Sequence, residues 1–181
     1  MVIEEIMYQH SLNSPDKIAI ISGELRVSYG ELWRKISQAA DWFSSKGWDK
    51  NSRIVISASK NIDFIYTYFG AHLAGMICVP IDPETNAIRL KRIIECASPS
   101  AIIGELRNKD VYDIIPFSKV KGTVESTFDF PKGTDRADLL FTTGTTATKL
   151  YMKHCYPACG ISATGLPSTS PANCACSYEK L

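Results

Sequence analysis

The chain has 181 residues, which is enough for one domain with a buried core. Hydrophobic residues make up 45% and charged residues 22%, as in an ordinary globular protein. Twenty basic and nineteen acidic residues leave a formal net charge of +1, which argues against a nucleic-acid-binding surface and a polybasic membrane patch. The acidic start MVIEEIMYQHS is unlike a signal peptide, and no apolar run reaches the length of a membrane span, so we expect a cytoplasmic protein.

The first elements are predicted to be a helix, a hairpin and a second helix. Residues 2–11 have helical spacing that places Ile3, Ile6 and Met7 on one face. Two short β-type runs, 17–22 and 25–28, flank Gly23-Glu24 and predict a hairpin. Ser28 and Glu31 then form an S-x-x-E capping box. The helix that it starts has an apolar stripe of Leu32, Ile36, Ala39, Ala40 and Phe43 and is expected to end by Gly47.

Strands and helices then alternate. Short apolar runs at 53–59, 76–80 and 101–104 predict buried strands, and residues 61–75 and 86–97 have helical spacing, the first of these helices capped by Asn61. One further strand is suggested within 108–130, and residues 137–141 form the last predicted strand. Strands joined by short helical crossovers pair in parallel. The predicted fold class is therefore α/β, a layered and largely parallel sheet with flanking helices.

The last predicted strand runs directly into five small residues, Thr142, Thr143, Gly144, Thr145 and Thr146, here called the Thr/Gly loop. Phosphate groups require backbone N–H groups that point at them, and hydroxyls add further donors. The loop offers five amides and four hydroxyls. It fits neither the Walker A pattern nor G-x-G-x-x-G. Its composition alone leaves open an ordinary surface loop.

The Thr/Gly loop resembles the signature loop of the adenylate-forming superfamily, which includes acyl-CoA synthetases, luciferases and the adenylation domains of peptide synthetases. That signature reads approximately T-[ST]-G-T-T-G-x-P-K-G, and residues 138–146 match its first part. The segments SPDKIAI (14–20), RVSYGEL (26–32) and AGMICVPIDP (74–83) resemble other family segments, in the same order and with similar spacing. Residues 1–146 are thus identified as the N-terminal part of an adenylate-forming large domain.

The resemblance implies an activity and a set of ligands. In the family, the loop holds the β- and γ-phosphates of ATP, usually with Mg²⁺, while a carboxylate substrate attacks the α-phosphate. The acyl group then passes to the thiol of coenzyme A or of a carrier protein. By resemblance, Thr142, Thr143, Gly144, Thr145 and Thr146 are the nucleotide-binding residues. No catalytic residue and no metal ligand is assigned.

The match stops abruptly after Thr146. Ala147 stands where the signature has glycine, and Lys149, Leu150 and Tyr151 stand where it has Pro, Lys and Gly. Residues 147–181 are rich in cysteine and poor in acids and have no lasting periodicity, so we expect a disordered tail, interpreted as out-of-frame or foreign sequence. Because the family is much longer, we expect this fragment to be inactive and poorly soluble.

Two other interpretations remain open. The first 146 residues could form a stand-alone ATP- or phosphate-binding module. Alternatively, the chain could be a non-enzymatic protein with a metal-binding tail formed by Cys155, Cys159, Cys174 and Cys176, near His154. Cys78 and Cys96 lie in apolar surroundings and are expected to be buried. His10, His72 and His154 show no catalytic pattern, and His72 is expected to be a partly buried structural imidazole.

Overall fold

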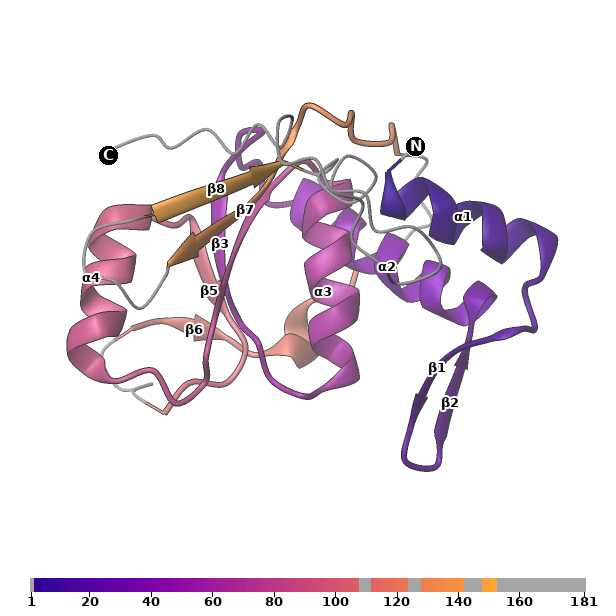
Figure 1. Ribbon diagram of the computed structural model, residues 1–181, viewed down its shortest axis with the longest axis horizontal. Coiled ribbons are helices and arrows are strands. Elements are labelled where there is room, and N and C mark those ends of the chain that lie inside the picture. Colours follow the sequence, from indigo (N-terminus) through magenta and orange to yellow (C-terminus); the bar gives the residue numbers. More distant parts are fainter. Residues whose placement is uncertain (1, 108–111, 124–127, 142–147, 153–181) are drawn as a thin grey trace, which may run out of the picture.

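The computed structural model describes residues 2–107, 112–123, 128–141 and 148–152. Its main sheet has six strands in the order β6-β5-β3-β4-β7-β8 (Figure 1). The neighbouring strands from β6 to β7 are parallel, which confirms the predicted largely parallel α/β sheet. The strands are β3 (Arg53–Ser57), β4 (Ile77–Ile81), β5 (Ala101–Ile103), β6 (Ile114–Ile115), β7 (Arg136–Phe141) and β8 (Thr148–Met152).

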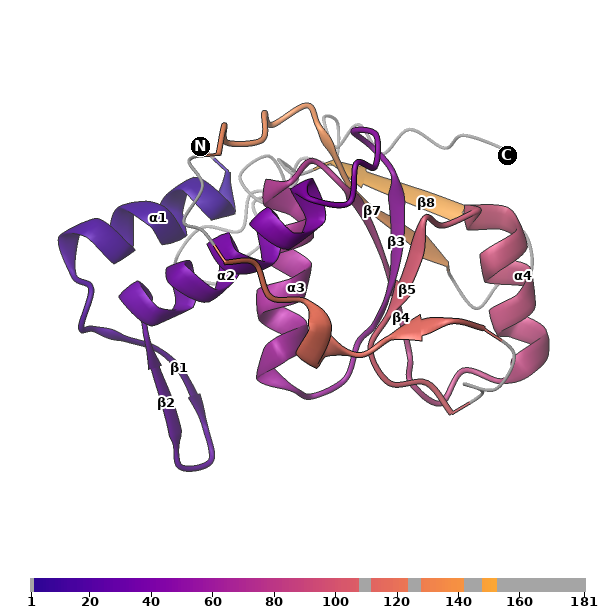
Figure 2. The same cartoon turned by 180° about the vertical axis from the view of Figure 1, so that it is seen from behind.

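Four α-helices and a separate hairpin complete the described fold. The helices are α1 (Ile3–Asn13), α2 (Tyr29–Ser44), α3 (Ile62–Leu73) and α4 (Ala87–Ala97), with a short 3₁₀ helix at Phe117–Lys119. Strands β1 (Ile18–Ser22) and β2 (Leu25–Ser28) form the predicted hairpin, which extends from the body beside α2 (Figure 2). The predicted N-caps at Ser28 and Asn61 are confirmed, because Ser28 Oγ accepts a hydrogen bond from the amide of Glu31 and Asn61 Oδ1 accepts one from the amide of Asp63.

The main sheet has a hydrophobic core on each face. Ile54 and Ile56 of β3 pack toward α2 and α3, whereas Val55, between them, packs toward α4. Strand β4 alternates in the same way, with Cys78 in the core of α2 and α3 and Val79 in the core of α4. Burial on both faces explains why these strands read as continuous apolar runs in the sequence.

Helices α2 and α3 approach each other closely at Gly70. A Cβ atom at this position would lie 2.5 Å from the Cβ of Ala39, 2.9 Å from the amide nitrogen of Ala40 and 3.0 Å from the carbonyl oxygen of Ile36. Two of these three neighbours are backbone atoms of α2, so they cannot move aside like the end of a flexible side chain. The absence of a side chain at Gly70 therefore sets the separation of the two helices.

The apolar face predicted for α1 is only partly buried. Ile3 and Ile6 were expected to lie on one face with Met7, but they are 44% and 39% exposed. The buried face contains Met7 and the carboxylate residue Glu4, which is 0% exposed. Helix α1 is thus oriented so that Glu4, and not Ile3 or Ile6, points into the molecule. The physical reason is the contact of Glu4 with the buried His72 of α3.

The predicted end of regular structure at Phe141 was also wrong. Strand β8 follows at Thr148–Met152 and pairs antiparallel with β7, for example Leu139 with Leu150 and Phe141 with Thr148. The alternation of apolar and polar residues in 148–152 is too short to predict a strand. Strand β8 is instead stabilised by pairing with the edge of β7. The rest of the expected tail lies outside the described residues.

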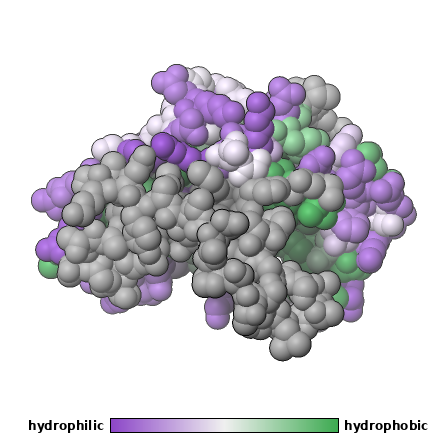
Figure 3. All heavy atoms as spheres, turned by 45° about the horizontal axis from the view of Figure 1, so that its top comes forward, coloured by the Kyte–Doolittle hydropathy of each residue, from purple (hydrophilic) through white to green (hydrophobic). Residues whose placement is uncertain are grey.

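Several large apolar side chains remain exposed on α1, on the β1–β2 hairpin and on α4. They are Ile3, Ile6, Leu12, Ile18, Ile21, Leu25 and Ile88. Hydrophobic and hydrophilic residues are both visible on the face shown in Figure 3. Within the described part of the chain, no helix combines the length and the apolar character that crossing a bilayer requires.

Candidate functional site

The parallel strands end side by side and define one edge of the main sheet. This carboxyl edge is formed by the last residues of β3, β4, β5 and β7, namely Ser57, Ile81, Ile103 and Phe141. In open α/β sheets, ligands bind outside the carboxyl ends of the strands. The Thr/Gly loop begins at the residue after Phe141 and therefore leaves the sheet at this edge. Residues 142–147 themselves lie outside the described residues.

Strand β7 is held against the rest of the sheet by contacts on both of its faces. In the ladder, Asp138 pairs with Cys78 of β4, and Leu139 is buried in the core beneath α4. At the end of the strand, Arg89 Nη2 of α4 donates a hydrogen bond of 3.3 Å to the carbonyl oxygen of Phe141. The backbone amide of Arg89 in turn donates to Asn86 Oδ1, the cap of α4, at 2.9 Å. The first turn of α4 thus fixes the point at which the chain enters the Thr/Gly loop.

Replacing Arg89 with methionine is expected to lower the free energy of unfolding by about 1 kcal/mol, because the carbonyl of Phe141 loses a charged donor while most of the aliphatic packing remains. The measurement is urea denaturation followed by circular dichroism. Arg92→Met on the same helix is the matched control, since Arg92 is exposed and its loss should leave stability unchanged. Equal effects of the two substitutions would show that the bond to Phe141 contributes nothing.

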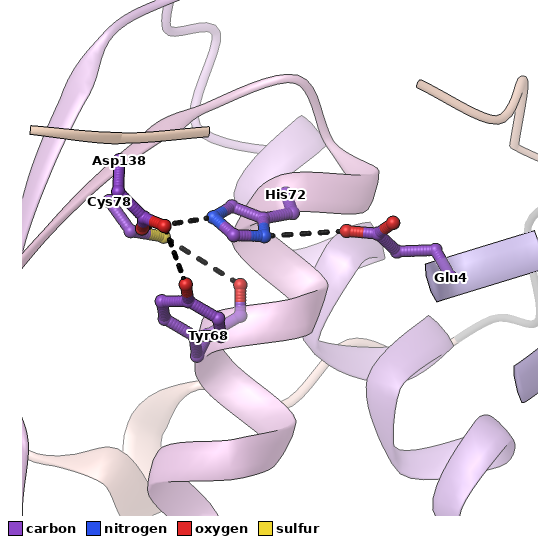
Figure 4. A network of polar contacts seen from close by, with 5 residues as sticks. All are labelled: Glu4, Tyr68, His72, Cys78 and Asp138. Atoms are coloured by element: carbon purple, nitrogen blue, oxygen red, sulfur yellow. Dashed lines mark hydrogen bonds and ion pairs between the residues drawn. The ribbon is translucent and has the colours of Figure 1, made fainter. Parts of the chain in front are cut away.

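A largely buried polar cluster extends from the sheet, past α3, to α1. It consists of Glu4, Tyr68, His72, Cys78 and Asp138 (Figure 4). His72 Nδ1 lies 3.3 Å from Glu4 Oε1, and His72 Nε2 lies 3.4 Å from Asp138 Oδ1. The hydroxyl of Tyr68 donates to Asp138 Oδ2 at 2.8 Å. The cluster therefore joins α1, α3, β4 and β7 through polar groups alone.

The environment of His72 favours its charged form. Burial by itself lowers the pKa of this imidazole, but the charge of Cys78 and the contacts with Asp138, Cys78 and Glu4 together raise the pKa well above its ordinary value. The side chain of His72 is 4% exposed and that of Glu4 0%, while Asp138 is 16% exposed. The raised pKa favours the imidazolium form of His72 between the carboxylates of Glu4 and Asp138. His72 was expected to be partly buried, and its side chain is more deeply buried than predicted.

The sequence contains only weak signals of this cluster. His72 interrupts the apolar helix 62–73, and Asp138 interrupts the apolar run 137–141, so each is a polar residue at a position of core character. Glu4 follows no such pattern, because exposed isoleucines surround it. Cys78 is buried as expected, but the predicted burial of Cys96 was wrong, because this residue of α4 is only half-buried. His10 stacks on Tyr29, with ring centroids 4.8 Å apart, and lies outside the cluster.

The fold is an open, mostly parallel α/β sheet, a class of fold in which ligands bind outside the carboxyl ends of the strands. The family model described as AMP-binding enzyme matches residues 8–149 of the chain. The match covers most of the chain and includes β7 and the Thr/Gly loop. The chain belongs to the AMP-binding enzyme family, and the resemblance to the adenylate-forming superfamily is confirmed.

Two curated proteins illustrate the similarity at the level of sequence. N-benzoylphenylalaninol synthetase apmA of Penicillium brevicompactum is 24% identical over 169 residues, covering 89% of this chain and 7% of that protein. The nonribosomal peptide synthetase GRA1 of Gibberella zeae is 26% identical over 155 residues, covering 81% of this chain and 2% of that protein. The chain thus spans only a small part of the length of either relative.

A solved structure shows the same fold. The N-terminal subdomain of NpsA from Klebsiella oxytoca, in complex with 3-hydroxybenzoyl-AMSN, superimposes with a TM-score of 0.74 at 16% identity. The similarity covers 84% of this chain and 41% of that subdomain. The mostly parallel sheet with flanking helices is therefore the fold of the NpsA N-terminal subdomain over the part that this chain spans.

Proposed function

We propose that this chain forms the phosphate-binding part of an ATP-dependent ligase that adenylates a carboxylate and then transfers the acyl group to a thiol. The observation that carries the proposal is the position of β7, which delivers the Thr/Gly loop to the carboxyl edge of a parallel sheet. The family match supports it, because that match extends through the loop to residue 149.

In this proposal the Thr/Gly loop binds the β- and γ-phosphates of ATP. The amides and hydroxyls of Thr142, Thr143, Thr145 and Thr146, with the amide of Gly144, donate to the phosphate oxygens. The described residues suit this role, because Arg89 and the capped first turn of α4 hold the entrance of the loop. Bound ATP with Mg²⁺ supplies the activated phosphorus and neutralises the charge of the pyrophosphate leaving group.

The substrate is a carboxylic or amino acid, and the acceptor is the thiol of a carrier protein in preference to coenzyme A. Support comes from the curated relatives, since both are synthetases and one is named a nonribosomal peptide synthetase. Because the chain spans only 7% and 2% of these two relatives, the side chain of the acid stays outside the proposal.

The polypeptide of these 181 residues is expected to release no pyrophosphate by itself. It corresponds to 41% of the solved subdomain, and a phosphate loop without the remaining walls of the site cannot align a carboxylate with phosphorus. The measurement is pyrophosphate release and ATP–pyrophosphate exchange across a panel of amino, aryl and fatty acids. An intact adenylation domain assayed in parallel is the positive control. Turnover well above the no-enzyme blank would contradict this expectation.

A thermal-shift measurement with millimolar ATP and Mg²⁺ separates the stand-alone binding module from the fragment. A ligand that binds only the native state raises the melting temperature. The fragment is expected to show no ATP-dependent shift beyond that caused by the same concentration of inorganic phosphate. A shift that requires ATP, without turnover, would favour the binding module.

We further propose that residues 1–146 form the domain and residues 147–181 a tail of different origin, with β8 as its only described part. The end of the family match at residue 149 supports this boundary. Translation of the other two reading frames beyond codon 146 tests it. A G-x-P-K-G continuation in one of those frames is expected.

A further inference from the structure

Three side chains with atoms suited to a transition metal meet inside the molecule, at the end of the strands opposite to the carboxyl edge. His72 comes from the last turn of α3, Cys78 from the start of β4 and Asp138 from β7. One nitrogen, one sulfur and one oxygen ligand atom from these residues all lie within 4.8 Å of one another. Figure 4 shows the three side chains converging from their separate elements.

The separations are close to those of a coordination shell. Ligand atoms about 2.0 to 2.3 Å from a tetrahedral zinc ion lie about 3.3 to 3.6 Å from each other. His72 Nε2 and Asp138 Oδ1 are 3.4 Å apart, longer than a strong hydrogen bond but equal to a tetrahedral edge. Cys78 Sγ lies within 4.8 Å of both of these ligand atoms, so the three sites need to draw together only slightly to surround one ion.

The remaining two members of the cluster lie where they orient these ligands. The hydroxyl of Tyr68 donates to Asp138 Oδ2 at 2.8 Å, which leaves Oδ1 of the same carboxylate directed at His72. Glu4 Oε1 lies 3.3 Å from His72 Nδ1, so the carboxylate keeps a proton on Nδ1 and presents Nε2 as the ligand atom. A carboxylate behind the histidine and a hydrogen bond behind the liganding carboxylate are the usual second shell of a zinc site.

We propose that His72, Cys78 and Asp138 bind a zinc ion through Nε2, Sγ and Oδ1, with Glu4 and Tyr68 as positioning residues. Thiolate, imidazole and carboxylate together suit zinc and its substitute cobalt, and not magnesium or calcium. Binding needs Cys78 as a thiolate and Nε2 of His72 without a proton, so any proton on either atom passes to solvent, and water completes the shell. The ion ties β7 to α3 and β4 and so stabilises the strand that leads to the Thr/Gly loop.

The proposal is independent of the proposed function, and its test must exclude the cysteines at the end of the chain. The protein is therefore the full chain in which Cys155, Cys159, Cys174 and Cys176 are replaced by serine. After treatment with a chelator, it is titrated with Zn²⁺ against a chromophoric competitor and its zinc content is measured by mass spectrometry. One zinc per chain is expected, together with a higher melting temperature in the zinc-bound form.

Substitution of single residues in this background identifies the ligands. Cys78→Ala is expected to abolish stoichiometric binding, whereas Cys96→Ala, the matched control at the other described cysteine, retains it. With Co²⁺ in place of zinc, the thiolate-to-cobalt absorption band should appear in the background protein and disappear in Cys78→Ala. Asp138→Asn is the second ligand variant, because it keeps an oxygen acceptor for Tyr68 if Cys78→Ala fails to fold.

Substitution of the positioning residues Tyr68 and Glu4 is expected to reduce the affinity for zinc without removing the site, a result that a purely structural role would not produce. Tyr68→Phe and Glu4→Gln are each expected to weaken zinc binding about 10- to 100-fold while leaving one site per chain. Absence of zinc binding by the tail-substituted chain, or equal binding by Cys78→Ala and Cys96→Ala, would overturn the proposal. In either case His72 would serve only as a buried cation between two acids.

Discussion

Replacing His72 with leucine is expected to lower the free energy of unfolding by about 3 kcal/mol when zinc is removed by a chelator. The substitution leaves Glu4, which is 0% exposed, without the cation 3.3 Å away, and Asp138 loses the same partner at 3.4 Å. Among the described residues, neither carboxylate oxygen of Glu4 has a hydrogen-bond partner that could compensate. The measurement is urea denaturation at pH 7 in the presence of EDTA.

The double variant Glu4→Leu with His72→Leu is the control for this prediction. Replacing a buried ion pair by apolar residues of similar size is often neutral, whereas removing one partner is costly. The double variant is therefore expected to recover most of the stability, and Tyr68 continues to donate to the remaining Asp138. A double variant as unstable as His72→Leu alone would show that the loss comes from packing and not from an unpaired buried acid.

Gly70→Ala is expected to cost about 2 kcal/mol of unfolding free energy, as overpacking does in a well-packed core. The new Cβ would lie 2.5 Å from the Cβ of Ala39, so α3 must move away from α2. The overpacking cost is thus larger than the gain of about 1 kcal/mol that alanine brings over glycine within a helix, so the net effect is destabilising. Thermal and urea denaturation measure the net effect.

A second substitution across the interface distinguishes overpacking from other causes. Ala39→Gly removes the nearest neighbour of the new Cβ, so the double variant should be more stable than the sum of the two single effects predicts. Rescue is expected to be partial, because the contacts with Ala40 N and Ile36 O remain. Additive losses in the double variant would contradict the clash at Ala39.

The local elements were predictable because each has its own signal. The Ser28 and Asn61 caps begin α2 and α3, and buried apolar runs mark β3 and β4. The burial of α1 was not predictable from its own residues. The spacing of its apolar residues favours burial of Ile3 and Ile6. The ion pair with His72, which is distant in the sequence, instead turns Glu4 inward. Pairing across distant segments overrides a local pattern whenever a buried polar group needs its partner.

The candidate functional site was likewise predictable only in part. The Thr/Gly loop is visible in the sequence because phosphate binding needs consecutive small residues, although 142–146 lie outside the described residues and their role stays a proposal. The cluster around His72 was missed, since its members come from four elements with no common spacing. Strand β8 was missed because the edge of β7, and not its own sequence pattern, stabilises it.

The position of β7 has a consequence for the order of assembly. Strands β3, β4 and β5 follow one another through single helices, so their pairing closes short loops. Strand β7 pairs with β4 only after the whole β5–β6 region has been made, and the ladder between them is brief, with Cys78 opposite Asp138. Contacts between distant segments form late because more chain entropy is lost before they are made. During biosynthesis we therefore expect β7 to dock after β3, β4 and β5 have paired, because its contact with β4 closes the longest stretch of chain.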